Sequence, residues 1–223
     1  MNQLPTLDGP RLQPATGGPP EQLAILLHGV GADGNDLIGL APFFQRTLPG
    51  ALIVSPHAPF AFDMAPTGFQ WFSLQDFAPE TRLAGARAAA PILDAFIDAQ
   101  LAEHGLAEDK LVLIGFSQGA IMSLHVGPRR ARPLAGILGF SGMLAGPHLL
   151  AGEIVTRPPV LLTHGDADPI LPVHSLPEAV AGLKAAGIAV QSHLRPGLGH
   201  GIDDECVRLG QDFLARIFAP AGG

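Results

Sequence analysis

The sequence predicts an α/β fold in which a doubly wound, mainly parallel sheet carries helices on both faces. Short apolar segments typical of buried strands alternate along the chain with longer segments of helical periodicity. The motifs with the clearest chemical potential each follow a predicted strand, and in such sheets a site lies at the carboxyl ends of the strands. With 223 residues, the chain is long enough to bury one continuous core.

The predicted strands are short apolar segments, several of which end at glycine, proline or histidine. They cover residues 23–27, 51–54, 111–115, 134–140, 160–163 and 188–194. The predicted helices have apolar residues at helical spacing. They cover residues 36–48, 81–104, 173–186 and 202–218, and a further helix begins at Ala120.

Pro91 lies inside the longest predicted helix, which therefore either kinks there or begins anew with the proline in its first turn. No repeat of fixed period and no internal linker divides the chain. We therefore expect residues 1–20 to form an N-terminal lead-in segment and residues 21–223 to form a single domain.

The composition disfavours several classes of partner and compartment. A net charge of −7 argues against a nucleic-acid partner, which would select a basic face. Cys206 is the only cysteine, so an internal disulfide is impossible and nothing indicates an oxidising compartment. Residues 1–20 lack the apolar core of a signal peptide, and no segment approaches the roughly 18 apolar residues that cross a bilayer. We expect a cytoplasmic protein without stable membrane insertion.

Ser117 lies at the centre of a G-x-S-x-G motif at residues 115–119. The motif lies between a predicted strand and a predicted helix, as in the nucleophile elbow of serine hydrolases. A serine at so sharp a turn has strained backbone geometry, so the residues two positions away on each side must lack a Cβ. The turn lifts the hydroxyl clear of the sheet at the start of the helix. We interpret Ser117 as a nucleophile.

Ser141 also follows an apolar segment within a similar sequence, but the rest of the motif is missing. Met143 stands where the last glycine of the motif would be, and Gly146 and Pro147 follow where a helix should continue. Ser141 is therefore interpreted as a loop or supporting residue.

His200 is the candidate general base. A serine hydroxyl is a poor nucleophile near neutral pH and needs a base, normally a histidine that is itself oriented by a carboxylate. Of the nine histidines, His200 lies in a loop after a predicted strand, between Gly199 and Gly201. The two glycines would let the loop bring the imidazole close to the elbow. The remaining histidines suit structural positions in strands, helices or other loops.

Asp168 and Asp166 compete for the role of the acid, because both follow the same predicted strand. We favour Asp168, since Pro169 fixes the backbone directly after it; Asp166 would then form a hydrogen bond within the same turn. Asp203 and Asp204 suit the first turn of the last helix, where carboxylates complement the helix dipole. The chain order Ser117, Asp168, His200 is the order expected for a hydrolase with this elbow.

The oxyanion hole needs two N–H donors directed at the developing charge. The main-chain N–H of Gln118, the residue after the nucleophile, is the first candidate. The second should come from a loop after an early strand, and residues 28–34 are the glycine-rich loop in that position. We choose the N–H of Val30. A phosphate-binding role for this loop is disfavoured because no G-K-[ST] sequence follows.

Residues 56–79 form a long irregular segment that is rich in proline, glycine and phenylalanine and contains the only tryptophan. Such loops in compact domains are usually functional or disordered, and the aromatic content argues against disorder. We expect residues 60–72 to form a wall of a substrate pocket, with Trp71 and Phe72 as contacts. The alternative is that these aromatic side chains only pack against the sheet.

These motifs together resemble the phospholipase/carboxylesterase family of α/β-hydrolases, which includes the acyl-protein thioesterases. The matching segments are residues 27–34, 70–72, 115–119, 164–169 and 199–201. The resemblance implies an α/β-hydrolase fold and a catalytic triad of Ser117, Asp168 and His200. It also implies an oxyanion hole formed by the main-chain N–H groups of Val30 and Gln118. Relatives usually carry a larger residue at position 30, which affects the shape of the pocket more than the chemistry.

The resemblance further implies a serine carboxylesterase that hydrolyses short- to medium-chain esters through an acyl-enzyme, without cofactor or metal. No metal-ligand spacing is evident in the sequence. The expected partner is a small ester or acyl substrate, and a homodimer is possible, as relatives occur as monomers and dimers. An acyl-protein thioesterase or a lysophospholipase is the alternative. A catalytically silent binding protein is disfavoured because every member of the triad is present.

Overall fold

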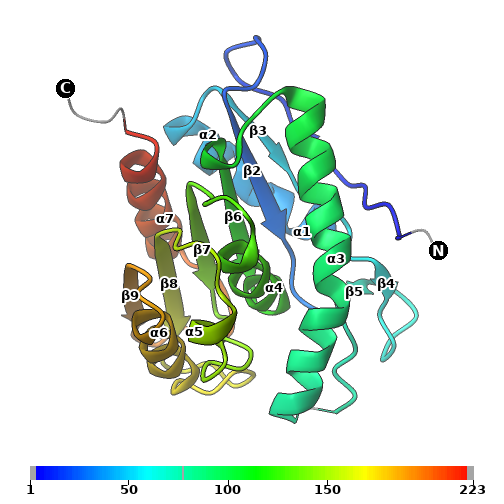
Figure 1. Ribbon diagram of the computed structural model, residues 1–223, viewed down its shortest axis with the longest axis vertical. Coiled ribbons are helices and arrows are strands. Elements are labelled where there is room, and N and C mark those ends of the chain that lie inside the picture. Colours follow the sequence, from blue (N-terminus) through cyan, green and yellow to red (C-terminus); the bar gives the residue numbers. More distant parts are fainter. Residues whose placement is uncertain (1–3, 77, 220–223) are drawn as a thin grey trace.

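The computed structural model describes residues 4–76 and 78–219 and contains a seven-stranded sheet (Figure 1). Neighbouring strands follow the order β1-β3-β2-β6-β7-β8-β9, and all pairs are parallel except β1–β3. The strands are β1 (Arg11–Leu12), β2 (Gln22–Leu27), β3 (Ala51–Val54), β6 (Leu111–Phe116), β7 (Gly136–Phe140), β8 (Val160–Gly165) and β9 (Val190–Arg195). The predicted mainly parallel sheet is confirmed.

Helices cover both faces of the sheet, as the doubly wound prediction requires. They are α1 (Gly34–Leu37), α2 (Ala41–Thr47), α3 (Pro79–His104), α4 (Gln118–Val126), α5 (Leu150–Glu153), α6 (Ser175–Ala185) and α7 (Asp204–Ile217). Side chains of α3 and α4 pack with one face, those of α2 and α7 pack with the other, and α6 packs against β8 at the margin of the sheet. Figure 1 shows β9 at that margin, beside α6 and α7.

Alternation along the central strands explains this two-sided burial. In β2, Leu23, Ile25 and Leu27 belong to the core under α3 and α4, whereas Ala24 and Leu26 belong to the core under α2 and α7. Successive side chains of a strand point to opposite faces, and a parallel strand covered on both faces reads as an uninterrupted apolar segment. The elbow strand β6 follows the same rule.

The structure corrects several predicted boundaries. The helix predicted at residues 36–48 is divided into α1, a short 3₁₀ segment and α2. The long helix begins at Pro79 and continues to His104 with Pro91 inside it, so it does not begin anew at the proline. The residues on either side of Pro91 pack into the core, and this tertiary packing offsets the lost hydrogen bond.

Three two-residue strands lie outside the predicted elements. In the lead-in segment, β1 adds an antiparallel edge strand to the sheet, where Arg11 pairs with Val54. The segment at residues 56–79 contains a small hairpin of β4 (Phe60–Ala61) and β5 (Phe69–Gln70). Two-residue strands leave too short an alternation pattern for detection in sequence.

Within the described ranges, no helix has the length and apolar character that a bilayer-spanning segment needs.

Candidate active site

Ser117 lies between β6 and α4 with φ 53° and ψ −117°, outside the conformations that non-glycine residues usually adopt. The two glycines of the motif are required because a side chain at either position would clash with the main chain. A Cβ on Gly119 would lie 1.8 Å from the carbonyl oxygen of Leu27, and one on Gly115 would lie 2.4 Å from the carbonyl oxygen of Gly119. The N–H of Ser117 donates to the carbonyl of Phe140 at 2.9 Å, which anchors the turn to β7. The structure therefore has the sharp strand-to-helix turn that the motif predicts.

Ser141, at the end of β7, also has a positive φ of 45°. Its N–H donates to the carbonyl of Thr163 at 2.8 Å, and its hydroxyl donates to the carbonyl of Gly201 at 3.3 Å. The second positive φ does not place Ser141 at the start of a helix. Ser141 instead connects the end of β7 to the loop that carries His200.

Asp168 follows β8, and its two carboxylate oxygens have separate partners. The Oδ1 atom accepts from the N–H groups of Ile170 and Leu171 at 2.8 and 2.9 Å. The Oδ2 atom lies 2.7 Å from Nδ1 of His200. Burial alone would raise the pKa of Asp168, but the hydrogen bonds from His200 and from the two amides outweigh it, and the pKa is lowered. Asp168 is therefore an ionised, oriented acceptor beside the imidazole.

Asp166 has a different partner from the one predicted. Its Oδ1 atom accepts from the N–H of Gly197 at 2.7 Å, so the bond crosses to the loop after β9 instead of closing the turn of Asp166. The chain also brings these loops together through main-chain bonds from Asp166 to Arg195 and from Ala167 to Leu198, at 3.1 and 3.0 Å. Asp166, the less favoured candidate for the acid, thus helps to hold the His200 loop against the Asp168 loop.

The loop that carries His200 is also closed at its base. The guanidinium of Arg195, at the end of β9, donates to the carboxylate of Asp203 at 2.9 and 3.2 Å. Asp203 in turn caps α7 by accepting from the N–H of Cys206 at 2.8 Å, so it lies directly before the first turn, in which it was predicted, and Asp204 lies within that turn. The ring of Phe116, directly before Ser117, lies 4.9 Å from the His200 ring between centroids. This contact places the imidazole beside the elbow.

His164 is a neighbour of Asp168 that the sequence reasoning assigned only a structural role. Its side chain is buried, with Nε2 at 3.0 Å from the carbonyl oxygen of Leu171 and 3.5 Å from Oδ2 of Asp168. The carbonyl can only accept, so Nε2 carries the proton. His164 therefore supports the same short loop whose amides bind Asp168.

The loop after β2 contacts the elbow from the other side. A Cβ on Gly29 would lie 3.3 Å from the Cβ of Ser117. Gly31 has φ 80° within a turn in which the N–H of Ala32 donates to the carbonyl of Gly29 at 3.3 Å. No acceptor among the described residues takes a hydrogen bond from the N–H of Val30 or from that of Gln118. Both predicted oxyanion donors are thus unpaired within this part of the chain.

Buried His28 holds this loop in place. Its Nδ1 donates to the carbonyl of Gly29 at 2.7 Å, and its Nε2 accepts from the N–H of Ala58 at 2.9 Å. Burial lowers the pKa of His28 and outweighs the opposing effect of the bond to Gly29. The neutral ring matches this bonding pattern, because one nitrogen donates and the other accepts.

The side chain of Gln118 has a structural role that sequence reasoning missed. Its Oε1 accepts from the N–H of Trp71 at 2.8 Å, and its Nε2 donates to the carbonyl of Phe72 at 2.7 Å. The indole N–H of Trp71 donates to the carbonyl of His28 at 3.0 Å. The aromatic segment is therefore fastened to both the elbow and the β2 loop. A glutamine after the nucleophile gives no such signal in sequence, because its partners are main-chain groups.

Trp71 and Phe72 lie in the core, with 0% and 4% of their surface exposed. A Cβ on Gly85 of α3 would lie 2.7 Å from the ring of Phe72, which shows how closely the two segments pack. Packing against the sheet, the alternative left open in sequence, describes both side chains in this structure. Their contact with a substrate stays a prediction.

A cavity of about 430 Å³ lies between α3, the segment after β7 and α6. Its apolar lining includes Leu83, Met143 and Leu149, and Glu80, Arg82, His148 and Glu178 lie around it. Gly142, directly before this segment, would place a Cβ 3.5 Å from the carbonyl oxygen of Ser117. The segment that begins at Gly142 thus connects the surroundings of the elbow to the cavity, whose lining consists of residues that the sequence reasoning did not select.

Comparisons with known proteins agree with the fold. The family model described as Phospholipase/Carboxylesterase matches residues 14–218. Esterase YpfH of Escherichia coli K12 is 30% identical over 196 residues, which cover 88% of this chain and 83% of that protein. Acyl-protein thioesterase 1 of Kluyveromyces lactis is 30% identical over 167 residues, covering 70% of this chain and 73% of its own length. The crystal structure of esterase PE8 has a TM-score of 0.91 and 40% identity, over 96% of this chain and all of that one.

Proposed function

Because the chain belongs to the phospholipase/carboxylesterase family of α/β-hydrolases, we propose that Ser117, Asp168 and His200 give it carboxylesterase activity. The enzyme is a carboxylic ester hydrolase. The observation that carries the assignment of residues is the 2.7 Å contact between His200 Nδ1 and Asp168 Oδ2 beside the strained elbow of Ser117.

The proposed reaction has two matching halves. His200 accepts the proton of the Ser117 hydroxyl through Nε2 as the serine oxygen attacks the ester carbonyl. Asp168 accepts from Nδ1–H and stabilises the imidazolium, and the N–H groups of Val30 and Gln118 bind the oxyanion. The imidazolium returns the proton to the departing alcohol, which leaves an acyl-enzyme. Water, deprotonated by His200, then releases the acid and restores the serine.

A short- to medium-chain ester is the substrate class that the site suits. The cavity of about 430 Å³ between α3, the segment after β7 and α6 has apolar lining residues suited to an acyl chain or an alkyl alcohol. Acyl-protein thioesterase and lysophospholipase activities are the alternatives within the same chemistry. Values of kcat/KM for a short ester, an acyl thioester and a lysolipid would rank them. We expect the short ester to have the highest value; a higher value for the thioester or lysolipid would favour that alternative.

The reactive serine can be identified by labelling with a fluorophosphonate probe. We expect the probe to modify Ser117 and to leave Ser117→Ala unlabelled, because only an activated serine reacts. Ser141→Ala is the matched control, since it removes the other buried serine with a positive φ, and it should still be labelled. Labelling of Ser117→Ala at the wild-type rate would refute the assignment.

We also propose a cytoplasmic location. Cys206, the only cysteine, is buried and makes no disulfide, which suits a reducing compartment. Cell fractionation would test this expectation, and recovery of the protein in an extracytoplasmic fraction would contradict it.

A further inference from the structure

The outer edge of β9 is open to solvent along most of its length. Residues 191–194 are all exposed, although the strand belongs to the central sheet. On the inner side, the carbonyl of Ala189 accepts from Val160 N–H at 2.9 Å and the carbonyl of Arg195 accepts from Asp166 N–H at 3.1 Å. Main-chain groups of alternate residues point to opposite sides of a strand. The N–H and C=O groups of Val190, Ser192 and Leu194 therefore point outward.

The residues of the β9 strand itself lack the features that normally prevent strand pairing. Long open edges in soluble proteins usually carry lysine, proline, an inward-pointing charge or a bulge. Residues 190–194 contain no proline, glycine or formally charged side chain, and the six residues of β9 pair with β8 in unbroken register. The opposite margin of the sheet ends in β1, which has only two residues. Of the two edge strands of the sheet, β9 is therefore the one with the longer row of main-chain groups available for pairing.

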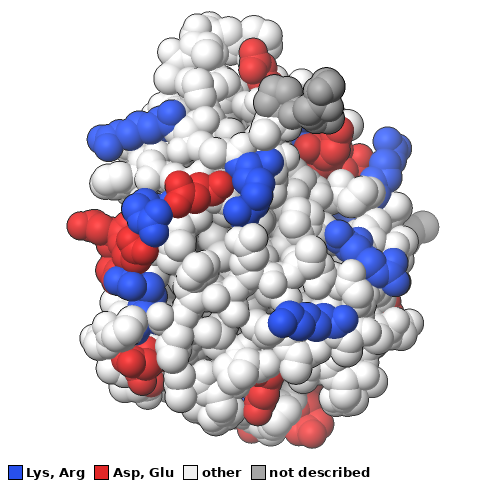
Figure 2. All heavy atoms as spheres, turned by 90° about the vertical axis from the view of Figure 1, so that its left-hand side faces the viewer, with Lys and Arg blue, Asp and Glu red and all other residues white. Residues whose placement is uncertain are grey.

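The surface around the edge is apolar and hollowed on both sides. Figure 2 shows an uncharged area through the middle of this face, with charged side chains scattered around it. Leu194 is 48% exposed, and Val173 and Ile170 in the β8–α6 connection are also exposed. A hollow of about 340 Å³ lies between α6 and β9, lined by residues that include Val180, Ala181 and Ser192.

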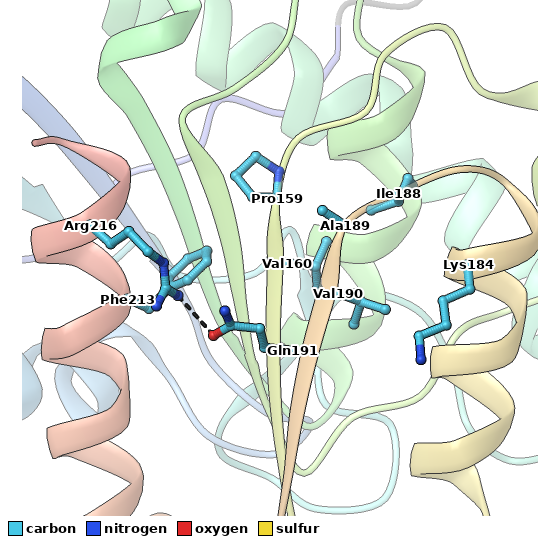
Figure 3. Close-up of a pocket in the computed structure, with 9 residues that line it drawn as sticks. All are labelled: Pro159, Val160, Lys184, Ile188, Ala189, Val190, Gln191, Phe213 and Arg216. Atoms are coloured by element: carbon cyan, nitrogen blue, oxygen red, sulfur yellow. Dashed lines mark hydrogen bonds between the residues drawn. The ribbon is translucent and has the colours of Figure 1, made fainter. Parts of the chain in front are cut away.

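A second hollow, of about 520 Å³, lies at the start of β9 (Figure 3). Val160, Ile188 and Val190 contribute apolar lining. On the α7 side, the guanidinium of Arg216 donates to Oε1 of Gln191 at 2.8 Å and lies over the ring of Phe213. The hydrogen bond thus holds the Gln191 side chain on the α7 side of the strand.

We propose that β9 is a self-association surface, on which a second copy of this chain pairs its own β9 in antiparallel orientation about a two-fold axis at Ser192. In this register Ser192 opposes Ser192 of the second copy, and Val190 opposes Leu194. The outward N–H and C=O groups of all three residues find partners across the axis. The two sheets would form one continuous sheet across the dimer.

The register favours a second copy over an unrelated strand because it is self-complementary. Val190 and Leu194 form an apolar pair on the face toward α6, and Gln191 opposes His193 on the face toward α7. No formally charged residue of the strand directly opposes a like charge, since Arg195 lies opposite Ala189. Lys184 lines both hollows, beside Val190 in one and beside Ser192 in the other, so its long side chain has to turn towards solvent and away from its symmetry equivalent.

Sedimentation velocity over a wide concentration range tests this surface. We expect the wild-type mass to double as concentration rises. Ser192→Pro removes an outward N–H without removing a bond to β8 and should raise the dimer Kd at least roughly 10-fold. Met64→Lys is the control, because Met64 is 63% exposed on a different segment, and it should dimerise normally. A wild type that stays monomeric, or a Ser192→Pro variant that dimerises normally, would overturn the proposal.

Cysteine cross-linking tests the register itself. Opposed residues of a hydrogen-bonded antiparallel pair have Cα atoms about 5.5 Å apart, within the range of a disulfide. Ser192→Cys should form a covalent dimer under mild oxidation, whereas Gln191→Cys should not, because residue 191 opposes residue 193. The native Cys206 is buried and does not compete. Equal cross-linking of the two variants would reject the register, and retained melting temperature and esterase activity would show that both are folded.

Discussion

Nδ1 of His200 lies 2.7 Å from Oδ2 of Asp168, although 32 positions separate the two residues. Two loops make this contact possible. Asp166 binds the N–H of Gly197, and Arg195 binds Asp203, so the loop of His200 is fastened at both its start and its base. The contact therefore depends on polar residues that do not themselves take part in the proposed reaction.

Loss of the Arg195–Asp203 ion pair should change the acid stability of the protein. The hydrogen bond from Arg195 lowers the pKa of Asp203 from 3.8 to about 2. A carboxyl with a lowered folded pKa stabilises the fold above its unfolded pKa, and this contribution is lost as the pH falls from 3.8 towards 2. Asp203→Asn keeps a capping oxygen but removes the charge. We expect its melting temperature above pH 4 to fall by roughly 1–2 °C.

Thermal melts between pH 2 and pH 7 measure this effect. The Asp203→Asn variant should show a flatter decline than the wild type between pH 4 and pH 2. Asp204→Asn, one position along, is the matched control, because Asp204 forms no ion pair among the described residues. Parallel pH curves for wild type and Asp203→Asn would contradict the role of the ion pair.

Substitution of Gln118 should affect stability more than chemistry. Gln118→Ala leaves the buried N–H of Trp71 and carbonyl of Phe72 without partners, which should cost about 2–5 kcal/mol in the free energy of unfolding. The proposed oxyanion donor is the main-chain N–H, which alanine retains, so kcat should fall by no more than roughly 100-fold. Urea denaturation and ester kinetics on one preparation would check both. A kcat loss as large as that of a nucleophile variant, in a fully folded protein, would contradict the assigned role.

Gly119→Ala should destabilise the protein severely. The new Cβ would lie 1.8 Å from the main-chain oxygen of Leu27, which belongs to the central sheet and cannot move freely. We expect a loss of at least about 4 kcal/mol, or failure to fold. Gly39→Ala is the control, because its Cβ would meet no atom within 4 Å. Similar denaturation midpoints for the two variants would show that the close approach at the elbow is not required.

His164 should act as a positioning residue for Asp168. His164→Ala removes the bond to the carbonyl of Leu171 and frees the loop whose amides bind Asp168. We expect kcat to fall by roughly 10-fold or more, with little change in KM, because the substrate does not contact His164. Glutamine can place an amide nitrogen near the position of Nε2, so His164→Gln should recover part of kcat. Equal kcat values for the alanine and glutamine variants would indicate that packing alone matters.

The fold was predictable from sequence wherever a pattern was long enough. The central strands are continuous apolar segments because both faces are buried, and the strain at Ser117 was predictable from Gly115 and Gly119. The antiparallel strand β1 and the β4–β5 hairpin could not be recognised, because two residues carry no periodicity. Pro91 left two alternatives open in sequence, and the structure excludes a new helix start there, because the core packing of α3 keeps the helix continuous.

The site was predictable to the extent that its residues occupy strand ends. The contact between Asp168 and His200 follows from parallel topology, which brings distant loops to one rim. The functions of Gln118, Asp166 and His164 were not recognisable, because each binds main-chain groups of another segment. Such partners exist only in three dimensions and leave no motif in the chain.

Turnover of p-nitrophenyl butyrate by Ser117→Ala tests the central claim most directly, with Ser141→Ala measured beside it. The account predicts that kcat of Ser117→Ala falls roughly 10⁴-fold or more while its melting temperature stays close to that of the wild type. Ser141→Ala removes only the 3.3 Å bond to the carbonyl of Gly201 and should lose far less activity than Ser117→Ala. Near-wild-type turnover by a folded Ser117→Ala variant would contradict the assignment of the nucleophile.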